Sequence, residues 1–189
     1  MLGFFIFLGL LVVVAFWVIG IYNALVRLRV QCDNAWSDID VQLKRRYDLI
    51  PNVVETVKGY ATHERKAFED VINARARAMS AQGPAAKAEA ENILTGTLKS
   101  LFALAENYPQ LRAIESFTQL QSTLSEIEEF IQSARRYYNA VVRDLNTRIA
   151  IFPSNIIAGM FAFKPREFFE LETPAERVAP KVNFETEKA

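Results

Sequence analysis

The chain opens with a long stretch of apolar residues that contains no charge. Residues 1–26 include no Asp, Glu, Lys or Arg, and an apolar run extends from Leu2 to Val26. As a helix with about 1.5 Å rise per residue, this run is roughly 37 Å long, which exceeds a hydrocarbon core of about 30 Å. A cleaved signal peptide would have basic residues before a shorter apolar stretch, and none precede this run. The pattern predicts a retained transmembrane anchor over residues 1–26.

Beyond residue 26 the apolar positions recur every three or four residues, which is typical of helices with one buried face. The predicted helices cover residues 27–59, 63–81 and 84–106, and a last long helix ends at Phe152-Pro153. Pro51 is expected to interrupt or kink the first of these. Four consecutive helices joined by short turns predict an all-α fold. It consists of an N-terminal transmembrane helix followed by an antiparallel up-and-down four-helix bundle over residues 27–152.

The last helix has the most regular apolar stripe, a heptad-like pattern from Leu120 to Ile149 that also occurs in coiled coils. In an up-and-down bundle its C-terminal end returns toward the anchor, so we expect Ile149 to lie level with Trp36. Asn139 then lies level with Arg46, which falls on an apolar stripe and needs hydrogen-bond acceptors. We therefore predict that Asn139 or a backbone carbonyl binds Arg46.

These assignments define a candidate polar layer between the helices. Its members are Arg46, Asn52, Asn139, Asp144 and Asn146. The favoured interpretation is structural, because such a layer can fix the register of packed helices. The alternative is a polar pocket that binds a small ligand or a partner.

Two segments follow the predicted bundle. Residues 153–163 carry no charge but are too short, and too broken by Pro153 and Asn155, to cross a membrane. They either cap the bundle or lie at the membrane interface, and the candidate interfacial residues are Ile156, Ile157, Met160, Phe161 and Phe163. Residues 164–189 are expected to form a loosely ordered charged tail, with Phe168 and Phe169 docking its start.

Charge and composition argue against several functions. The 22 basic and 22 acidic residues give a net charge of zero, so no positive field would gather nucleic acid. With one His and one Cys, the chain lacks the ligands of a usual zinc site, and His63 is interpreted as a residue at a helix start. Glu126, Glu128 and Glu129 are interpreted as a solvated helix face. We expect no catalytic, cofactor or metal site, and hence no enzyme.

Basic residues that follow the apolar run predict the orientation, since such residues are retained in the cytoplasm. They are Arg27, Arg29, Lys44, Arg45 and Arg46. This distribution predicts an external N-terminus and a cytoplasmic bundle. Three nearby aspartates leave the opposite orientation open.

Several motifs resemble those of the LemA family of bacterial membrane proteins. They are Asp38-Ile39-Asp40, the block Leu43-Lys-Arg-Arg-Tyr-Asp-Leu-Ile-Pro-Asn52, Val57-Lys-Gly-Tyr-Ala61, His63-Glu64, Arg136-Tyr-Tyr-Asn139, Asp144-Leu-Asn146 and Phe152-Pro-Ser-Asn155. The resemblance covers nearly the whole chain and implies a membrane anchor with a helical bundle. It implies little about activity: members are associated with the cell envelope, some with magnetosome formation, and some look linked to a membrane protease.

Together these observations predict a single-pass protein of the bacterial cell (inner) membrane. We expect a helical scaffold or organiser of the cell envelope that acts by protein–protein association, including association with copies of itself. The alternative is an accessory or adaptor subunit of a membrane enzyme such as a quality-control protease. The expected partners are the lipid bilayer, further copies in a homo-oligomer, and in the alternative another membrane protein, but not nucleic acid.

Overall fold

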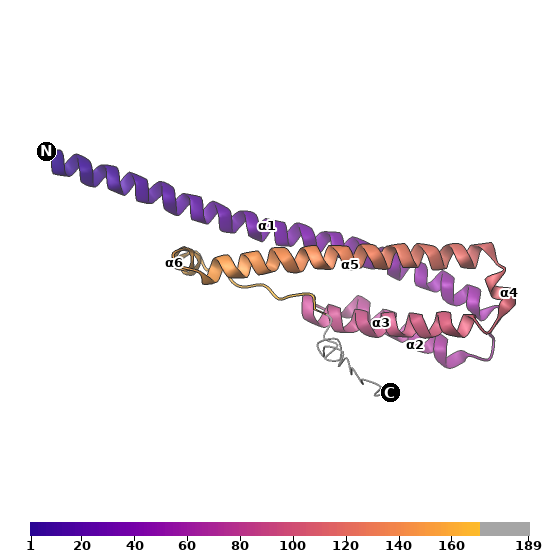
Figure 1. Ribbon diagram of the computed structural model, residues 1–189. Coiled ribbons are helices and arrows are strands. Elements are labelled where there is room, and N and C mark those ends of the chain that lie inside the picture. The colour runs from indigo at the N-terminus through magenta and orange to yellow at the C-terminus, as the bar shows by residue number, and fades with distance from the viewer. Residues whose placement is uncertain (171–189) are drawn as a thin grey trace, which may run out of the picture.

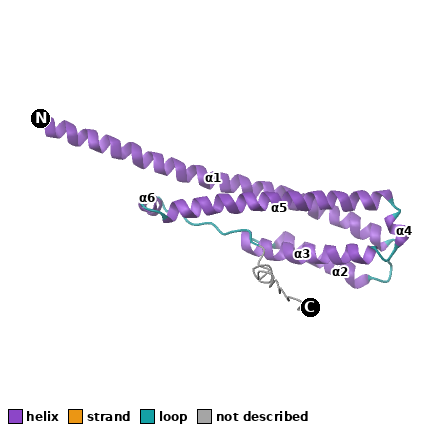
Figure 2. Ribbon diagram, in the orientation of Figure 1, coloured by secondary structure: helices purple, strands orange, loops and turns teal. Residues whose placement is uncertain are grey.

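The computed structural model describes residues 1–170, which form helices and no strands (Figures 1 and 2). Within this part of the chain the helices are α1 (Leu2–Lys58), α2 (Arg65–Ser80), α3 (Pro84–Ala105), α4 (Pro109–Arg112), α5 (Glu115–Ala150) and α6 (Ser154–Met160). The predicted all-α class is confirmed.

Helix α1 is continuous over 57 residues and passes the predicted boundary at residue 26 without a break. Up to about residue 20 nearly all of its side chains are exposed, whereas from Ile21 onward one face is buried in the core. In Figure 1 the first part of α1 projects beyond the other helices. An apolar, exposed segment is therefore joined directly to a core helix of the bundle.

The interruption predicted at Pro51 is absent, because α1 continues through this residue. Proline lacks the amide hydrogen that would bind the carbonyl oxygen four residues earlier, here that of Tyr47. Arg75 of α2 replaces that donor: its Nε lies 2.8 Å from the Tyr47 carbonyl oxygen. A contact between helices thus satisfies the acceptor that the proline leaves unpaired.

The main helices form two antiparallel pairs, α1 with α5 and α2 with α3 (Figure 1). The pair α2 and α3 lies against the half of α1 and α5 that is distant from the N-terminus. The short helix α4 makes the turn from α3 into α5. The direction of the four long helices alternates along the chain, as in the predicted up-and-down bundle.

The core includes the apolar stripes that the sequence pattern predicted on the two long helices. On α5 the buried members are Leu124, Ile127, Ile131, Tyr138, Val141 and Leu145, and on α1 they include Ile39, Leu43, Ile50, Val53 and Val57. Burying a large aliphatic side chain contributes about 1.5 to 3 kcal/mol relative to leaving it exposed. These two stripes face each other and hold the long pair together.

The predicted register between α1 and α5 is wrong. Tyr138, not Ile149, lies against Trp36, with 5.4 Å between the ring centroids. The shift corresponds to about three helical turns. Its cause is that the buried face of α1 begins at Ile21 rather than near Trp36, so α5 has a longer partner and extends further toward the apolar segment.

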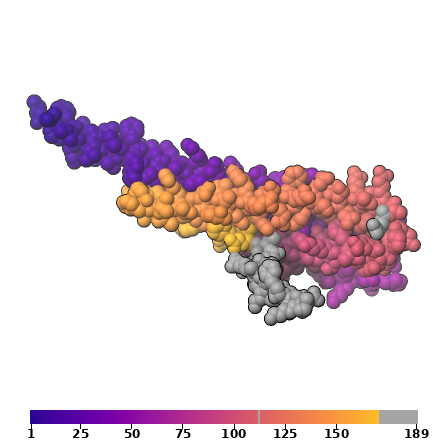
Figure 3. All heavy atoms as spheres, viewed as in Figure 1, coloured from indigo at the N-terminus to yellow at the C-terminus, as the bar shows by residue number. Residues whose placement is uncertain are grey.

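After α5, a turn with a cis Phe152–Pro153 peptide bond leads into α6. This helix lies against α1, where the Tyr22 ring contacts Phe161 and Phe163 at centroid distances of 4.7 and 5.8 Å. Residues 164–170 then run back along α1 and α5 toward the start of α3, and we call them the strap (Figures 1 and 3).

Loose order was predicted for residues 164–189. The strap does not agree with this expectation, because side chains of α1 and α5 bind it and Phe169 is buried. The predicted docking of Phe168 and Phe169 is confirmed, with Phe169 buried and Phe168 half-buried against the core. Residues 171–189 lie outside the described part of the chain.

Candidate functional site

The most buried charged group lies between α1, α3 and α5. Arg46 of α1 is 3% exposed, and its Nη1 atom lies 3.2 Å from Oε2 of Glu91 on α3 and 3.0 Å from Oε2 of Glu128 on α5. Its Nη2 atom donates to Oγ1 of Thr95 at 2.7 Å. One guanidinium therefore joins three helices through charge-assisted bonds, which are stronger than neutral ones.

Glu91 is the centre of this cluster on the α3 side. The Tyr47 hydroxyl donates to Glu91 Oε1, while Arg46 binds the other oxygen. Burial raises the pKa of the Glu91 carboxyl, and the bond from Tyr47 and the charge of Arg46 offset part of that rise. Burial also raises the pKa of Tyr47, and its bond to Glu91 adds to the shift. Because two acidic side chains face Arg46, the positive charge of this arginine is compensated within the chain.

A cavity of about 240 Å³ adjoins this cluster. Its lining residues are Arg46, Thr95, Leu98, Lys99, Phe102, Leu124, Ser125 and Glu128. The combination of an apolar floor with a few convergent polar groups is typical of sites for small molecules, although this cavity is smaller than most of them. In the described part of the chain, no group of three or more His, Cys, Asp or Glu side chains could hold a metal ion.

A second polar site holds the strap through its main chain. Asn146 Oδ1 accepts the Arg166 amide at 2.8 Å, and its Nδ2 donates to the Arg166 carbonyl at 2.9 Å. Asn139 binds Phe169 in the same way, at 2.9 Å to the amide and 3.1 Å to the carbonyl. The Tyr138 hydroxyl donates to the carbonyl of Glu167 at 3.0 Å. Five hydrogen bonds thus satisfy main-chain groups of the strap.

Side chains fix the two ends of the strap. Arg166 pairs with Asp33 of α1 at 2.7 Å. The Phe169 ring is 1% exposed and packs on Trp36, with 5.7 Å between the centroids. Burial raises the pKa of Tyr138, beneath the strap, to about 12. This phenol therefore remains a donor to the strap throughout the physiological pH range.

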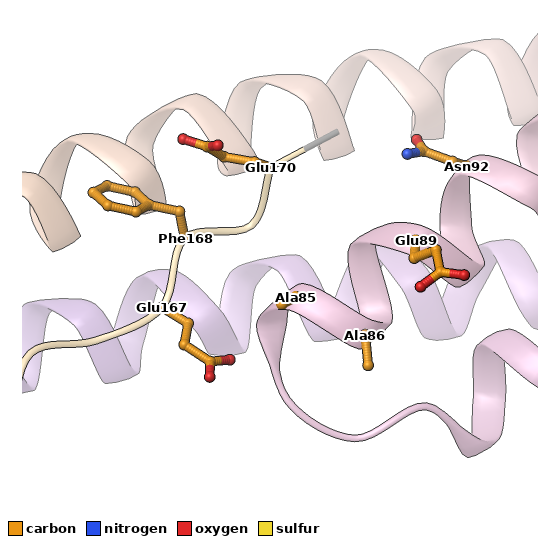
Figure 4. Close-up of a pocket in the computed structure, with 7 residues that line it drawn as sticks. All are labelled: Ala85, Ala86, Glu89, Asn92, Glu167, Phe168 and Glu170. Atoms are coloured by element: carbon orange, nitrogen blue, oxygen red, sulfur yellow. The ribbon is translucent and has the colours of Figure 1, made fainter. Parts of the chain in front are cut away.

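A wide cleft of about 810 Å³ separates the strap from α3. The lining residues are Ala85, Ala86, Glu89 and Asn92 on α3, and Glu167, Phe168 and Glu170 on the strap. Figure 4 shows the two groups on opposite sides of the cleft. The strap is therefore closely bound on its α1 and α5 side and open on its α3 side.

The predicted polar layer is divided in the structure. The predicted partner of Arg46 was Asn139 or a backbone carbonyl. Arg46 instead binds the side chains of Glu91, Glu128 and Thr95, because the register places Asn139 about three turns away. Asn139 and Asn146 are brought together, but by the strap. Asn52 and Asp144 are exposed and lie outside both sites.

The partners of Arg46 were not predicted from the sequence. Glu128 was interpreted as part of a solvated face, yet it is partly buried against Arg46. Glu91 lies in phase with Ala88, Leu94 and Leu98, the buried positions of α3. An acidic residue on an apolar stripe, opposite an arginine on another stripe, was a signal that could have identified this pair.

The candidate interfacial residues lie around α6 but differ in exposure. Ile157 is buried against the core, whereas Ile156, Met160 and Phe161 are 54%, 71% and 51% exposed. Phe163 is half-buried, with the Arg29 guanidinium 5.4 Å from its ring centroid. The segment thus caps the α1–α5 pair with one face and exposes apolar side chains on the other.

The structure defines a helical bundle built on a helix that is long and apolar enough to cross a membrane, the one such helix in the described residues. Its most apolar window of 18 residues has a mean hydropathy of 2.9, and the side chains there are almost all exposed. The chain belongs to the LemA family, whose family model matches residues 35–184.

Individual relatives support this assignment. Magnetosome protein MamQ 2 of Paramagnetospirillum magneticum is 26% identical over 180 residues, and the match covers 82% of this chain and 66% of the relative. Magnetosome protein MamQ of Magnetospirillum gryphiswaldense is 25% identical with the same coverage. Protein LemA of Metamycoplasma hominis is 26% identical over 161 residues, or 82% of this chain and 72% of the relative. The chain thus spans just under two thirds of the length of these MamQ proteins.

Proposed function

We propose that this protein is a membrane-anchored helical scaffold that acts by protein–protein association and not by catalysis, and that copies of the chain associate with one another. The observation that carries the proposal is the continuity of α1, which joins an exposed apolar segment to the core of the bundle without a hinge. A helix of this form would fix the bundle at a defined height and angle relative to a bilayer.

Anchoring is supported by the exposure of the first part of α1. A soluble core helix would bury these side chains, and here they project beyond the bundle (Figure 3). Cleavage as a signal peptide at the end of the apolar run, after Val26, would remove Ile21 and Leu25 from the core, where they are 7% and 0% exposed. Retention of α1 is therefore the interpretation consistent with packing.

Contact of α6 with the membrane interface follows from the same geometry. About 20 helical residues span a hydrocarbon core, so Tyr22 would lie near its edge, and α6 packs on Tyr22. The exposed Ile156, Met160 and Phe161 would then meet lipid. Phe161→Trp, in a chain without its native tryptophans, should be strongly quenched by brominated lipids, and an unquenched signal would exclude this contact.

The surface proposed for self-association is the outer groove between α1 and α5. Val41 and Phe130 are 56% and 57% exposed, and they line a shallow pocket of about 280 Å³ with Asp38, Gln42, Ser133 and Ala134. Anchored copies would share one orientation relative to the membrane, so they would meet through lateral faces such as this one. Apolar side chains with a polar border are typical of protein contact sites.

The experiment is a mass measurement of the particle extracted in mild detergent. We expect a homogeneous oligomer for the native chain and a monomer for Val41→Glu/Phe130→Glu. The matched control is Ile72→Glu/Met79→Glu on α2, where the native side chains are 52% and 50% exposed, and it should stay oligomeric. A native monomer would contradict self-association, and a stoichiometric membrane protease in the particle would favour the accessory role.

The setting that we propose is the bacterial cell (inner) membrane, with the bundle in the cytoplasm. Arg27 and Arg29 follow the apolar segment at once and lie on the side where the bundle lies, as the positive-inside rule requires for this orientation. The MamQ relatives are named magnetosome proteins, which supports a membrane-associated setting for this chain.

A further inference from the structure

The two asparagines that bind the strap are separated along α5 by about the same distance as the two strap residues that they bind. Asn139 and Asn146 are two heptad-related positions on α5, about 10.5 Å apart along the helix axis. Arg166 and Phe169 are three residues apart, which corresponds to about 10 Å in an extended chain. Each asparagine can therefore bind the amide and the carbonyl of one strap residue at the same time, as observed.

Main-chain recognition of this kind depends little on the identity of the bound residues. It is the basis on which many domains accept extended peptides, with a few side-chain pockets that add specificity. Here the specificity elements are the Trp36 ring for Phe169 and the Asp33 carboxylate for Arg166, and Trp36 is itself packed on Tyr138. The surface thus has the two components of a peptide-binding site.

The strap can be exchanged without separating the helices. Below it, α1 and α5 pack on each other through their own side chains, among them Cys32, Ala35 and Val142, each 0% exposed. On its other side the strap borders the open cleft toward α3 (Figure 4). A competing segment would replace the strap on a preformed surface and would not have to open the core.

We propose that the face of α1 and α5 beneath the strap is a peptide-binding site for an extended segment with arginine and phenylalanine three residues apart, and that the strap is its resident occupant. A partner protein that presents an Arg-x-x-Phe segment would bind by displacing the strap. The tethered strap competes at high effective concentration, so binding to the native chain is weak until the strap is released.

The test uses the full-length protein in detergent micelles and a fluorescent peptide with the sequence of residues 164–170, Lys-Pro-Arg-Glu-Phe-Phe-Glu. Arg166→Glu/Phe169→Ala removes the two side-chain anchors of the strap and leaves the receptor face unchanged. We expect this variant to bind the peptide about tenfold or more tightly than the native chain does, measured by fluorescence anisotropy, since aromatic and arginine anchors dominate such contacts. In a Trp17→Phe background, Trp36 emission should change when the strap leaves and return when the peptide binds.

Two controls make the result specific. Glu167→Ala removes an exposed side chain that borders the cleft and keeps the main-chain carbonyl that Tyr138 binds, so it should leave the site closed. Adding Asn139→Ala/Asn146→Ala to the released variant should abolish peptide binding, while far-UV circular dichroism shows that the helices persist. A peptide with alanine in place of its last phenylalanine should also fail to bind.

The proposal is overturned if Trp36 emission shows that the strap has left and the peptide still does not bind. It is also overturned if the asparagine substitutions leave peptide binding unchanged, or if Trp36 emission shows that the strap stays bound without its anchors. The strap site is separate from the outer groove of Val41 and Phe130. Failure of the peptide-binding proposal would therefore leave the proposed self-association untouched, and a monomeric native protein would leave the peptide-binding proposal untouched.

Discussion

At the residue scale, Arg46 shows how a single polar side chain can organise a helical core. A buried guanidinium without acceptors would be strongly unfavourable, and here two helices, α3 and α5, supply them. The bonds connect α1 to both α3 and α5, so they relate the long pair to the shorter pair. We interpret the cluster as structural, with the register of the helices as its consequence.

Replacing this arginine tests that interpretation. Arg46→Met should lower the free energy of unfolding by about 3 to 5 kcal/mol, because it leaves the buried Glu91 carboxyl without its charged partner. Urea unfolding followed by circular dichroism measures the change. Arg45→Met, at the neighbouring exposed position, is the matched control and should have little effect. Equal effects of Arg46→Met and Arg45→Met would contradict a structural role for the cluster. Adding Glu91→Gln to Arg46→Met should restore part of the lost stability.

The raised pKa of Glu91 predicts a dependence of stability on pH. The native carboxyl retains its proton above the ordinary value of 4.5, so the native state binds more protons than the unfolded state in that window. Stability from this group is therefore present below pH 4.5 and is lost as the pH rises through the native pKa. The difference in unfolding free energy between native protein and Glu91→Gln should change in this direction, and a difference independent of pH would refute the assignment.

At the scale of elements, α1 combines a segment that is long and apolar enough to cross a membrane with a core helix, and it stays helical through a proline. The last of these depends on α2, since Arg75 binds the carbonyl that Pro51 leaves unpaired. A sequence window around Pro51 contains no information about Arg75, which is why the sequence alone left an interruption of the helix open. The helix end at Lys58 and the turn into α2 agree more closely with the sequence pattern, because local turn residues determine them.

A double-mutant cycle measures this contact between elements. Arg75→Met should cost about 1 to 2 kcal/mol in the native chain, because the Tyr47 carbonyl loses its donor. In a Pro51→Ala background the alanine amide can bind that carbonyl within α1, so the same substitution should cost less. Arg77→Met, an exposed position on the same helix, serves as the control. Additive effects would show that Arg75 does not compensate for the proline.

At the scale of the whole molecule, the arrangement places three features in order along α1, starting from the apolar segment. The α6 helix lies level with Tyr22, the strap site follows at Asp33 and Trp36, and the Arg46 cluster lies further along α1. If α1 is anchored as we propose, the strap site would face partners close to the membrane surface. The α2–α3 turn would lie on the same side of the membrane as these sites.

Labelling of a single engineered cysteine tests the proposed orientation. Gln82→Cys in the exposed α2–α3 turn, with the buried Cys32 replaced by alanine, should be protected from a membrane-impermeant maleimide in intact cells. It should react once the membrane is permeabilised. Reaction in intact cells would place the bundle outside the cytoplasm and would reverse the proposed topology.

The sequence by itself determined the elements that depend on local pattern. The apolar segment, the long helices, their buried stripes and the family motifs all follow from residue types at short spacing, where propensity and periodicity act. The tertiary structure decided the axial register, the partners of Arg46 and Arg75, and the docking of the strap. A stripe with apolar residues every three or four positions defines which face is buried, but it repeats along the axis and so permits several registers. The selection among them depends on groups far apart in sequence, such as Arg46 with Glu128 and Asn139 with Phe169, which only the folded chain brings together.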